Sequence, residues 1–299
     1  MPYKKRLALV AALGTLLTLL TPALPSAQAY PCGRPSGCTS FELVSAGASY
    51  DWYPVKHRYE FKGGRTEPKE WEKSKGNSKQ YQQNGMLTLV ANKGKHTKPV
   101  TSTWTGRSHY YDKGRWETRM RMAPESSGGN PWMVEVALTP VSKKQYFCGA
   151  QDIHLLHWSP TEPSTAQLDI NTLPDNRFTM EKKLSRSITN DEWHVFAVEV
   201  TKERVLWFVD AQVVANEPRD KALSGKKFKF QVRLIPTAPG KVQEKFRIQL
   251  DWARYWTLAK PNSKSVAAPK TDLKTNRDAC PPVEQQPTSP STTPARATR

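Results

Sequence analysis

Acidic residues are scarce in this sequence relative to basic ones. Its 299 residues include 27 Asp and Glu against 45 Lys and Arg, which gives a formal net charge of +18 at pH 7. With 37% hydrophobic and 10% aromatic residues, the composition excludes a chain that is disordered throughout and a collagen-like repeat. Such a basic surface favours anionic wall polymers, acidic polysaccharides or membrane surfaces, although a basic surface without a specific partner is the alternative.

The sequence also lacks the motifs of several functional classes. It has no P-loop, no Gly-x-Gly-x-x-Gly turn and no Gly-x-Ser-x-Gly elbow, which excludes the common nucleotide-binding and serine-hydrolase classes. Neither the Cys-x₂-Cys nor the paired-histidine spacing of zinc sites is present, and no acidic loop demands calcium. We therefore expect no metal ion and no other cofactor.

Long hydrophobic runs are absent except near the start of the chain. Basic residues at positions 4–6 precede an apolar run, Leu7–Leu20, and a small-residue triplet ends at Ala29. Because this run is shorter than the roughly 20 residues that cross a bilayer, it predicts a secretory signal peptide over residues 1–29. Its removal leaves 42 basic and 27 acidic residues, a net charge of +15. We expect a secreted protein, extracellular or associated with a cell wall, without a membrane segment.

Cysteine is rare, with four residues in the whole chain, and all of them follow the predicted signal peptide. In an oxidising compartment they predict two disulfides. The three possible pairings remain open. The four residues are Cys32, Cys38, Cys148 and Cys280.

Short alternating or β-branched runs, bounded by Gly, Pro, Asn and Asp, fill the middle of the chain and predict an all-β fold. We expect an antiparallel β-sandwich of the jelly-roll type over residues 58–259. A cysteine-containing segment, 30–57, precedes it, and a disordered tail rich in Pro, Ser and Thr, 260–299, follows it. The best strands are 85–91, 114–122, 132–138, 193–200, 205–210 and 246–252.

The strand predicted around Arg115–Met122 has one charged and one largely apolar face. Alternation places Arg115, Glu117, Arg119 and Arg121 together. Such a stripe is usually a solvated face with cross-strand ion pairs, and only a place in a concave sheet would make it a binding surface.

Six segments, in this order, resemble the glycoside hydrolase family 16 domain, the jelly roll of laminarinases, lichenases, agarases and carrageenases. The resemblance covers about residues 58–257, and its clearest piece is Gly114-Arg115-Trp116-Glu117-Thr118-Arg119-Met120, which is similar to the family's "GRFEARM" strand. It implies a concanavalin A-like lectin/glucanase fold and an action on extracellular or cell-wall polysaccharide. The segments are 60–63 with Trp71, 84–89, 101–103, 114–120, 192–200 with 206–210, and 249–256.

The family's catalytic strand carries Glu-x-Asp-x-Glu or Glu-x-Asp-x-x-Glu, and here the corresponding segment is 148–157. The resemblance places Ala150 at the nucleophile position and His154 or Leu155 at the acid/base position, so only the central Asp152 is retained. Alternation directs Ala150, Asp152 and His154 to one face. A retaining glycosidase needs two carboxyl groups, and Ala150 supplies neither function.

Three functions remain open for this strand. The simplest is a polysaccharide-binding protein without the standard two-Glu mechanism. The second is an endo-glycanase that uses Asp152 with Glu135, although a salt bridge on the sheet face is the plainer role for Glu135. The third is a polysaccharide lyase with His154 as base, because jelly-roll lyases carry a similar Gln-Ile-His strand; ordinary hydrogen-bonded histidines are the alternative.

Aromatic and polar residues near this strand complete the predicted site. Sugar rings stack on Trp while their hydroxyls meet polar groups, and core or rim packing is the alternative for each Trp. Export argues against nucleic acid as the partner of this basic chain, and we expect a monomer. The predicted polysaccharide contacts are Trp104, Arg107, Trp132, His157 and Trp158.

Overall fold

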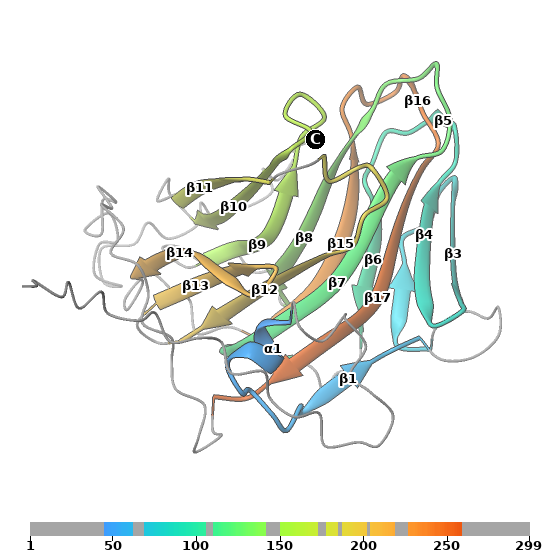
Figure 1. Ribbon diagram of the computed structural model, residues 1–299. Coiled ribbons are helices and arrows are strands. Elements are labelled where there is room, and N and C mark those ends of the chain that lie inside the picture. Colours follow the sequence, from blue (N-terminus) through green and yellow to red (C-terminus); the bar gives the residue numbers. More distant parts are fainter. Residues whose placement is uncertain are drawn as a thin grey trace, which may run out of the picture. The chain divides into compact units, whose positions relative to one another are not determined.

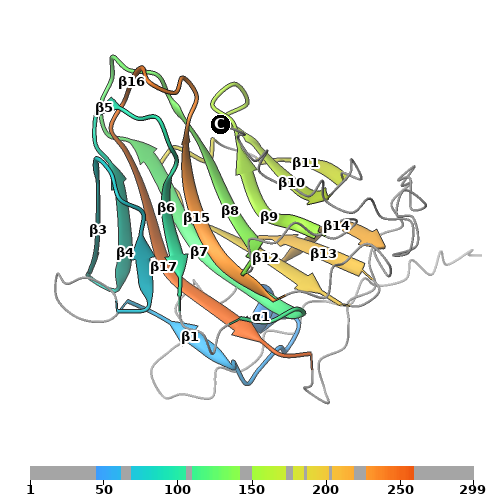
Figure 2. The ribbon, with the colours of Figure 1, turned by 180° about the vertical axis from the view of Figure 1, so that it is seen from behind.

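The computed structural model describes residues 45–61, 69–105, 110–141, 150–172, 178–184, 187–201, 204–218 and 227–258. All of them belong to one compact unit of the chain. Two large antiparallel sheets pack against each other, which confirms the predicted all-β sandwich (Figures 1 and 2). In the part that is described, no helix has the length and apolar character needed to span a membrane.

One sheet has eight strands. Seven follow the order β14-β13-β12-β7-β17-β4-β3, and β1 pairs with β17 at one side. Their bounds are β1 (His57–Tyr59), β3 (Ser78–Gln83), β4 (Met86–Ala91), β7 (Gly114–Pro124), β12 (His194–Val200), β13 (Arg204–Val209), β14 (Gln212–Pro218) and β17 (Phe246–Trp256).

The other sheet has seven strands in the order β11-β10-β9-β8-β15-β6-β2. A short pair, β5 (Gly94–Lys95) and β16 (Val242–Gln243), and the single-turn helix α1 (Ala46–Ser49) complete the described elements. The seven strands are β2 (Trp71–Lys73), β6 (Val100–Trp104), β8 (Trp132–Pro140), β9 (Ala150–Trp158), β10 (Thr165–Thr172), β11 (Phe178–Lys183) and β15 (Phe228–Pro236).

The predicted strands are confirmed to within a few residues. The longest difference is at the end of β17, which continues to Trp256, and β7 and β8 each continue two residues beyond their predicted ends, to Pro124 and Pro140. β17 and β7 alternate apolar and polar side chains over much of their length, which is the pattern of a sheet with one face on a core.

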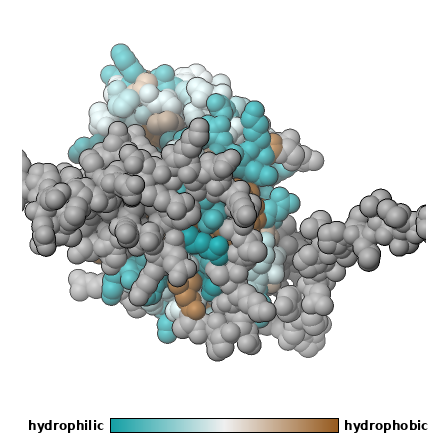
Figure 3. Space-filling model, turned by 90° about the vertical axis from the view of Figure 1, so that its left-hand side faces the viewer, coloured by the Kyte–Doolittle hydropathy of each residue, from teal (hydrophilic) through white to brown (hydrophobic). Residues whose placement is uncertain are grey.

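The core lies between the two sheets. In β15 every second side chain is buried, Phe228, Phe230, Val232 and Leu234 among them, and the residues between them are partly exposed. The described residues show no extended apolar surface, because only two of their large hydrophobic side chains are exposed, Val141 and Val242. Figure 3 agrees, since most described side chains on the face that it shows are hydrophilic.

Three of the four charged residues on one face of β7 are buried, which corrects the expectation of a solvated stripe; Arg121 is partly exposed. Arg115, Glu117 and Arg119 are each less than 5% exposed. The segment before β1 packs on this face and adds a small second core around Trp52, which contacts Trp256 edge-on. A buried ion pair, Nε of Arg115 to Oε2 of Glu199 at 2.7 Å, compensates one of the charges.

Glu117 anchors this covering segment. Its Oε2 accepts a hydrogen bond from Ser45 Oγ at 2.8 Å, and its Oε1 accepts from the backbone N–H groups of Ala46 and Gly47. Burial raises the pKa of Glu117 to about 7, although these hydrogen bonds and Arg254 oppose the rise. Gly47 permits the close approach, because a Cβ there would lie 2.6 Å from the Trp256 ring.

The raised pKa of Glu117 predicts a loss of stability as the pH rises. The pKa of this carboxyl is higher in the folded protein than in the unfolded chain. The protonated carboxyl therefore stabilises the folded protein at low pH, and this stabilisation is lost between about pH 4.5 and 7. Between pH 5 and pH 8, the unfolding free energy of the unmodified protein should fall by on the order of 3 kcal/mol more than that of Glu117→Gln. Urea unfolding at both pH values measures this difference.

Glu125→Gln is the matched control. Burial raises the pKa of Glu125, but its ion pairs with Lys245 and Arg247 lower it overall. This variant keeps the Glu117 carboxyl, so its unfolding free energy should fall between pH 5 and pH 8 by about as much as that of the unmodified protein. Equal pH dependence in the unmodified protein and in Glu117→Gln would contradict the role of Glu117.

Candidate functional site

Strand β9 carries a β-bulge in its middle. On one side β8 pairs Val136 with Leu156 and Ala137 with His154, so Leu155 has no partner there. The pairing with β10 shifts at the same place. Both leucines of the bulge lie in the core. Regular alternation would place His157 on the face opposite His154, and the bulge places both histidines on the outer face of the seven-stranded sheet.

One carboxylate oxygen holds both imidazoles. Nδ1 of His154 and Nδ1 of His157 each lie 3.0 Å from Oδ2 of Asp169, which comes from the neighbouring strand β10. His154 and Asp169 are buried, and His157 is partly exposed. Because an ionised carboxylate only accepts hydrogen bonds, both Nδ1 atoms donate and both Nε2 atoms are left for other partners.

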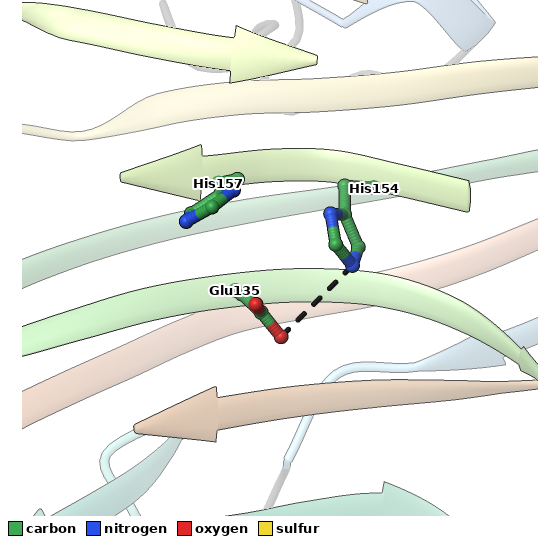
Figure 4. A group of neighbouring side chains, drawn as sticks. All are labelled: Glu135, His154 and His157. Carbon is green, nitrogen blue, oxygen red and sulfur yellow. Dashed lines mark ion pairs between the residues drawn. The ribbon is translucent and has the colours of Figure 1, made fainter. Parts of the chain in front are cut away.

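Arg233 of β15 contacts the other acidic side chains of the site. It pairs across the sheet with Glu135 of β8, and its Nε lies 2.7 Å from Oε2 of that residue. Its Nη2 lies 3.3 Å from Oδ2 of Asp152 and 3.1 Å from Nε2 of His154. Oε2 of Glu135 is 3.9 Å from Nε2 of His154 (Figure 4).

We call these six residues the β9 cluster: Glu135, Asp152, His154, His157, Asp169 and Arg233. They come from four adjacent strands, β15, β8, β9 and β10. Figure 4 shows three of them, with the side chain of His154 directed toward Glu135.

The cluster contains carboxyl groups with opposite pKa shifts. Burial raises the pKa of Asp152, and Arg233 partly opposes this rise. Burial also raises the pKa of Asp169, but the hydrogen bonds from the two histidines outweigh it and lower the pKa to about 2. The hydrogen bond to Asp169 raises the pKa of His157. Asp169 is therefore ionised at neutral pH, and His157 takes up a proton more readily than an isolated histidine.

The β9 cluster does not share the positive net charge of the chain. Three ionised carboxylates and one guanidinium give −2 when both imidazoles are neutral, and zero when both are protonated. The excess of basic residues is thus not concentrated at this site. The arrangement is suited to hydrogen bonding with hydroxyl groups, proton transfer or the binding of a cation.

Uncharged polar side chains continue the face beside the cluster. Gln231 of β15 donates from Nε2 to Oγ1 of Thr103 at 2.8 Å, and its Oε1 accepts from Oγ1 of Thr139 at 3.0 Å. These residues cross β6, β15 and β8, so the outer face of this sheet presents a continuous row of hydroxyl, amide and carboxylate groups.

The structure brings four of the predicted site residues together and separates the three tryptophans from them. Asp152, His154, His157 and Glu135 belong to the cluster. Trp104, Trp132 and Trp158 are at most 3% exposed and lie in the core. Their rings present no face to a sugar, so core packing replaces the predicted stacking role.

Hydrogen bonds and ring contacts fix these tryptophans. The indole N–H of Trp132 donates to the Glu244 carbonyl at 2.8 Å, and that of Trp158 donates to the Pro163 carbonyl at 3.1 Å. Trp104 stacks on Trp71 with ring centroids 5.8 Å apart. Arg107 and the four cysteines lie outside the described residues, so their predicted roles stay predictions.

Sequence reasoning missed Asp169 and Arg233. Both lie in runs with clear alternation, between Leu168 and Ile170 and between Val232 and Leu234, and the flanking residues are buried. That alternation indicates an outward acid and an outward base. Their proximity to His154 depends on the strand order, which the sequence does not reveal.

The bulge also offers a second alignment with the family motif. Three outward side chains in the described part of β9, Asp152, His154 and His157, have the spacing of Glu-x-Asp-x-x-Glu. In that alignment Asp152 stands at the first carboxyl position and His157 at the last. In both alignments no glutamate of β9 is available for the two-Glu mechanism.

Replacement of Asp169 by Asn should lower the pKa of His157, because the charge-assisted hydrogen bond that raises it is lost. An NMR titration of the imidazole signals between pH 4 and pH 9 measures this change. Asp210→Asn is the control, since Asp210 holds His194 on the other sheet in the same way, with Nδ1 to Oδ2 at 2.9 Å. A His157 titration that is unchanged in Asp169→Asn would contradict the assignment.

Comparisons with known proteins find solved structures of the same fold but no related sequence family. No protein-family model matches this chain, and no curated protein matches it. The catalytic domain of an endo-1,3-β-glucanase (laminarinase) from Thermotoga petrophila RKU-1 superposes with a TM-score of 0.55 at 14% identity, over 69% of this chain and 98% of that one.

Two other solved structures are similar to the same extent. The endo-β-1,3-glucanase from Pyrococcus furiosus has a TM-score of 0.55 at 17% identity, over 69% of this chain and 95% of its own. A Bacteroides ovatus family 16 enzyme of a mixed-linkage glucan locus, in complex with a product, has a TM-score of 0.53 at 11% identity, over 67% and 100%. The fold of the described chain is therefore the glycoside hydrolase family 16 jelly roll, as the resemblance predicts.

Proposed function

We propose that this protein is a secreted carbohydrate-active protein that binds polysaccharide on the outer face of the seven-stranded sheet, without the two-Glu retaining mechanism. One observation carries the proposal: among the described side chains of β9, Asp152, His154 and His157 face outward, and the strand contains no glutamate, so it supplies other hydrogen-bonding groups. The related folds are endo-glycanases, and this likeness supports the substrate class by analogy only.

The local charge favours a neutral polysaccharide. Arg233 already contacts two carboxylates, Glu135 and Asp152, so it is not free to neutralise a uronate. The adjacent row formed by Thr103, Gln231 and Thr139 offers hydroxyl and amide groups, which match sugar hydroxyls. These contacts argue against the lyase alternative, in which a cationic group would hold the uronate carboxylate.

A hydrolase that uses Asp152 and Glu135 is the second candidate. Burial raises the pKa of Asp152, the direction that suits a general acid, while Glu135 lies against the Arg233 guanidinium. Both carboxyl groups contact the same guanidinium, so they are near neighbours on adjacent strands. Their shared ion pairing is equally the pattern of a purely structural network.

Incubation of the secreted chain with neutral and uronate-containing polysaccharides tests these functions. We expect retention of a neutral polymer in affinity electrophoresis, with neither new reducing ends nor unsaturated ends. Asp152→Ala and His157→Ala should each weaken retention about tenfold, because each removes a partly exposed polar group that can meet a sugar hydroxyl. Lys79→Ala, an exposed residue of β3 on the other sheet, should leave retention unchanged.

The products separate the alternatives. Reducing ends that disappear in both Asp152→Asn and Glu135→Gln would favour the hydrolase, and unsaturated ends that require His154 would favour the lyase. Unchanged affinity in folded Asp152→Ala and His157→Ala, checked by circular dichroism, would exclude this face as the binding surface.

A further inference from the structure

We propose that lysines at one end of the sandwich form a second binding surface, which holds an anionic polysaccharide. Four segments meet at this end: 74–77, 92–99, 125–130 and 238–245. Together they contain six lysines and only two acidic residues, Glu125 and Glu244. We call the six lysines the lysine patch: Lys75, Lys93, Lys95, Lys98, Lys241 and Lys245.

The strand order brings these segments together, because each of them connects a strand of one sheet to a strand of the other. Segment 92–99, which contains β5, leads from β4 to β6, and segment 238–245, which contains β16, leads from β15 back to β17. The strands β5 and β16 pair antiparallel, with Val242 opposite Lys95. Figure 1 shows the two strands together at one end of the sheets.

Hydrogen bonds fix the four segments relative to one another. The backbone N–H of Asn92 donates to the Asn77 carbonyl at 3.1 Å, which joins the first two segments. The backbone N–H of Asn130 donates to the Val242 carbonyl at 2.9 Å, which joins the last two, and the β5–β16 pair connects the two halves. The lysines are therefore carried by an ordered backbone, so a ligand does not have to order it on binding.

The positive charge of this end is poorly compensated. Of the six lysines, only Lys245 has an ion-pair partner among the described residues, Glu125 at 2.9 Å. The other five lysines are exposed. With six lysines and two glutamates the four segments carry +4, whereas the β9 cluster carries −2 with neutral imidazoles. Part of the basic excess that is missing from the β9 cluster is thus found here.

The chemistry of the patch suits charges that are spread along a polymer. All basic residues of the four segments other than His96 are lysines, whose ammonium group is a compact point charge on a flexible stem. Such groups follow anionic substituents of variable position, whereas arginine favours planar, bidentate recognition.

A bilayer and a nucleic acid fit this end less well. The four segments contain no Trp, Tyr or Phe, so they offer no aromatic anchor for a membrane interface and no platform for stacked bases. The large apolar side chain exposed here is Val242, at 40%. The choice of a polysaccharide rests on the proposed function, and the position and charge of the surface do not.

Fluorescence anisotropy of labelled polygalacturonate fragments, titrated with the secreted chain, tests the proposal. We expect binding that weakens about tenfold when NaCl rises from about 0.05 M to about 0.3 M, because salt screens exposed charges. Methyl-esterified fragments, which keep the sugar chain and lose the charge, should bind no more tightly to the unmodified chain than to the lysine variant described next.

Replacement of four patch lysines by Gln should weaken polygalacturonate binding about tenfold. Lys93 is kept, because its Nζ donates to the Ser127 carbonyl at 2.9 Å and supports the fold. Retention of neutral polymer should not change in this variant. The four substitutions are Lys75→Gln, Lys95→Gln, Lys98→Gln and Lys241→Gln.

A second fourfold variant with the same net charge is the matched control. It replaces exposed lysines outside the four segments, and it should change polygalacturonate binding by less than about twofold, because charges beyond the screening length contribute little. Thermal melting confirms that both variants are folded. The control substitutions are Lys56→Gln, Lys113→Gln, Lys183→Gln and Lys227→Gln.

The outcomes separate this proposal from the proposed function. Equal weakening in the two fourfold variants would assign binding to the charge of the whole chain, and the lysine patch would be wrong. Tighter binding to phosphatidylglycerol vesicles or to duplex DNA than to polygalacturonate would also overturn it. If no neutral polymer is retained and polygalacturonate binding still requires the patch, the proposed function fails and the lysine patch stands.

Discussion

The hydrogen bonds that converge on Oδ2 of Asp169 are the interaction on which the rest of the candidate site depends. This one oxygen receives both Nδ1 atoms, at 3.0 Å each, and so fixes two imidazoles relative to each other. It can do so only because the bulge in β9 turns His157 to the side of His154. A backbone irregularity of one residue and a single buried carboxylate therefore determine which groups this face presents.

Charged side chains have different surroundings on the two outer faces of the sandwich. On the eight-stranded sheet, Arg115 and Glu117 are covered by the segment before β1, and hydrogen bonds and ion pairs compensate them inside the protein. On the seven-stranded sheet, Asp152, His157 and Arg233 keep part of their surface in contact with solvent. The first face serves stability, and the second has groups available for a ligand.

Most of the fold could be predicted from the sequence, because alternation of apolar and polar side chains is a local property. The strands at 114–122 and 246–252 are found where the alternation places them. The same alternation in β8 puts Trp132 on the face of Val134 and on the face opposite Glu135. The burial of this tryptophan could therefore also be predicted from the sequence.

The site itself could be predicted only in part. Asp152, His154 and Glu135 could be predicted as site residues from the family resemblance and from the alternation of side chains along a strand. The bulge at Leu155 and Leu156 does not, because it is a property of how β9 pairs with β8 and β10. The inclusion of Asp169 and Arg233 likewise depends on strand order, which brings together residues that are 64 positions apart in the chain.

The most direct test of the account follows the histidine ring signals by NMR while the best-retained oligosaccharide is added. The account predicts that the signals of His154 and His157 move together, with one dissociation constant, while those of His57, His96 and His194 stay in place. Movement of the His194 or His57 signals with no change at His154 and His157 would place the ligand elsewhere and contradict the assignment of this face.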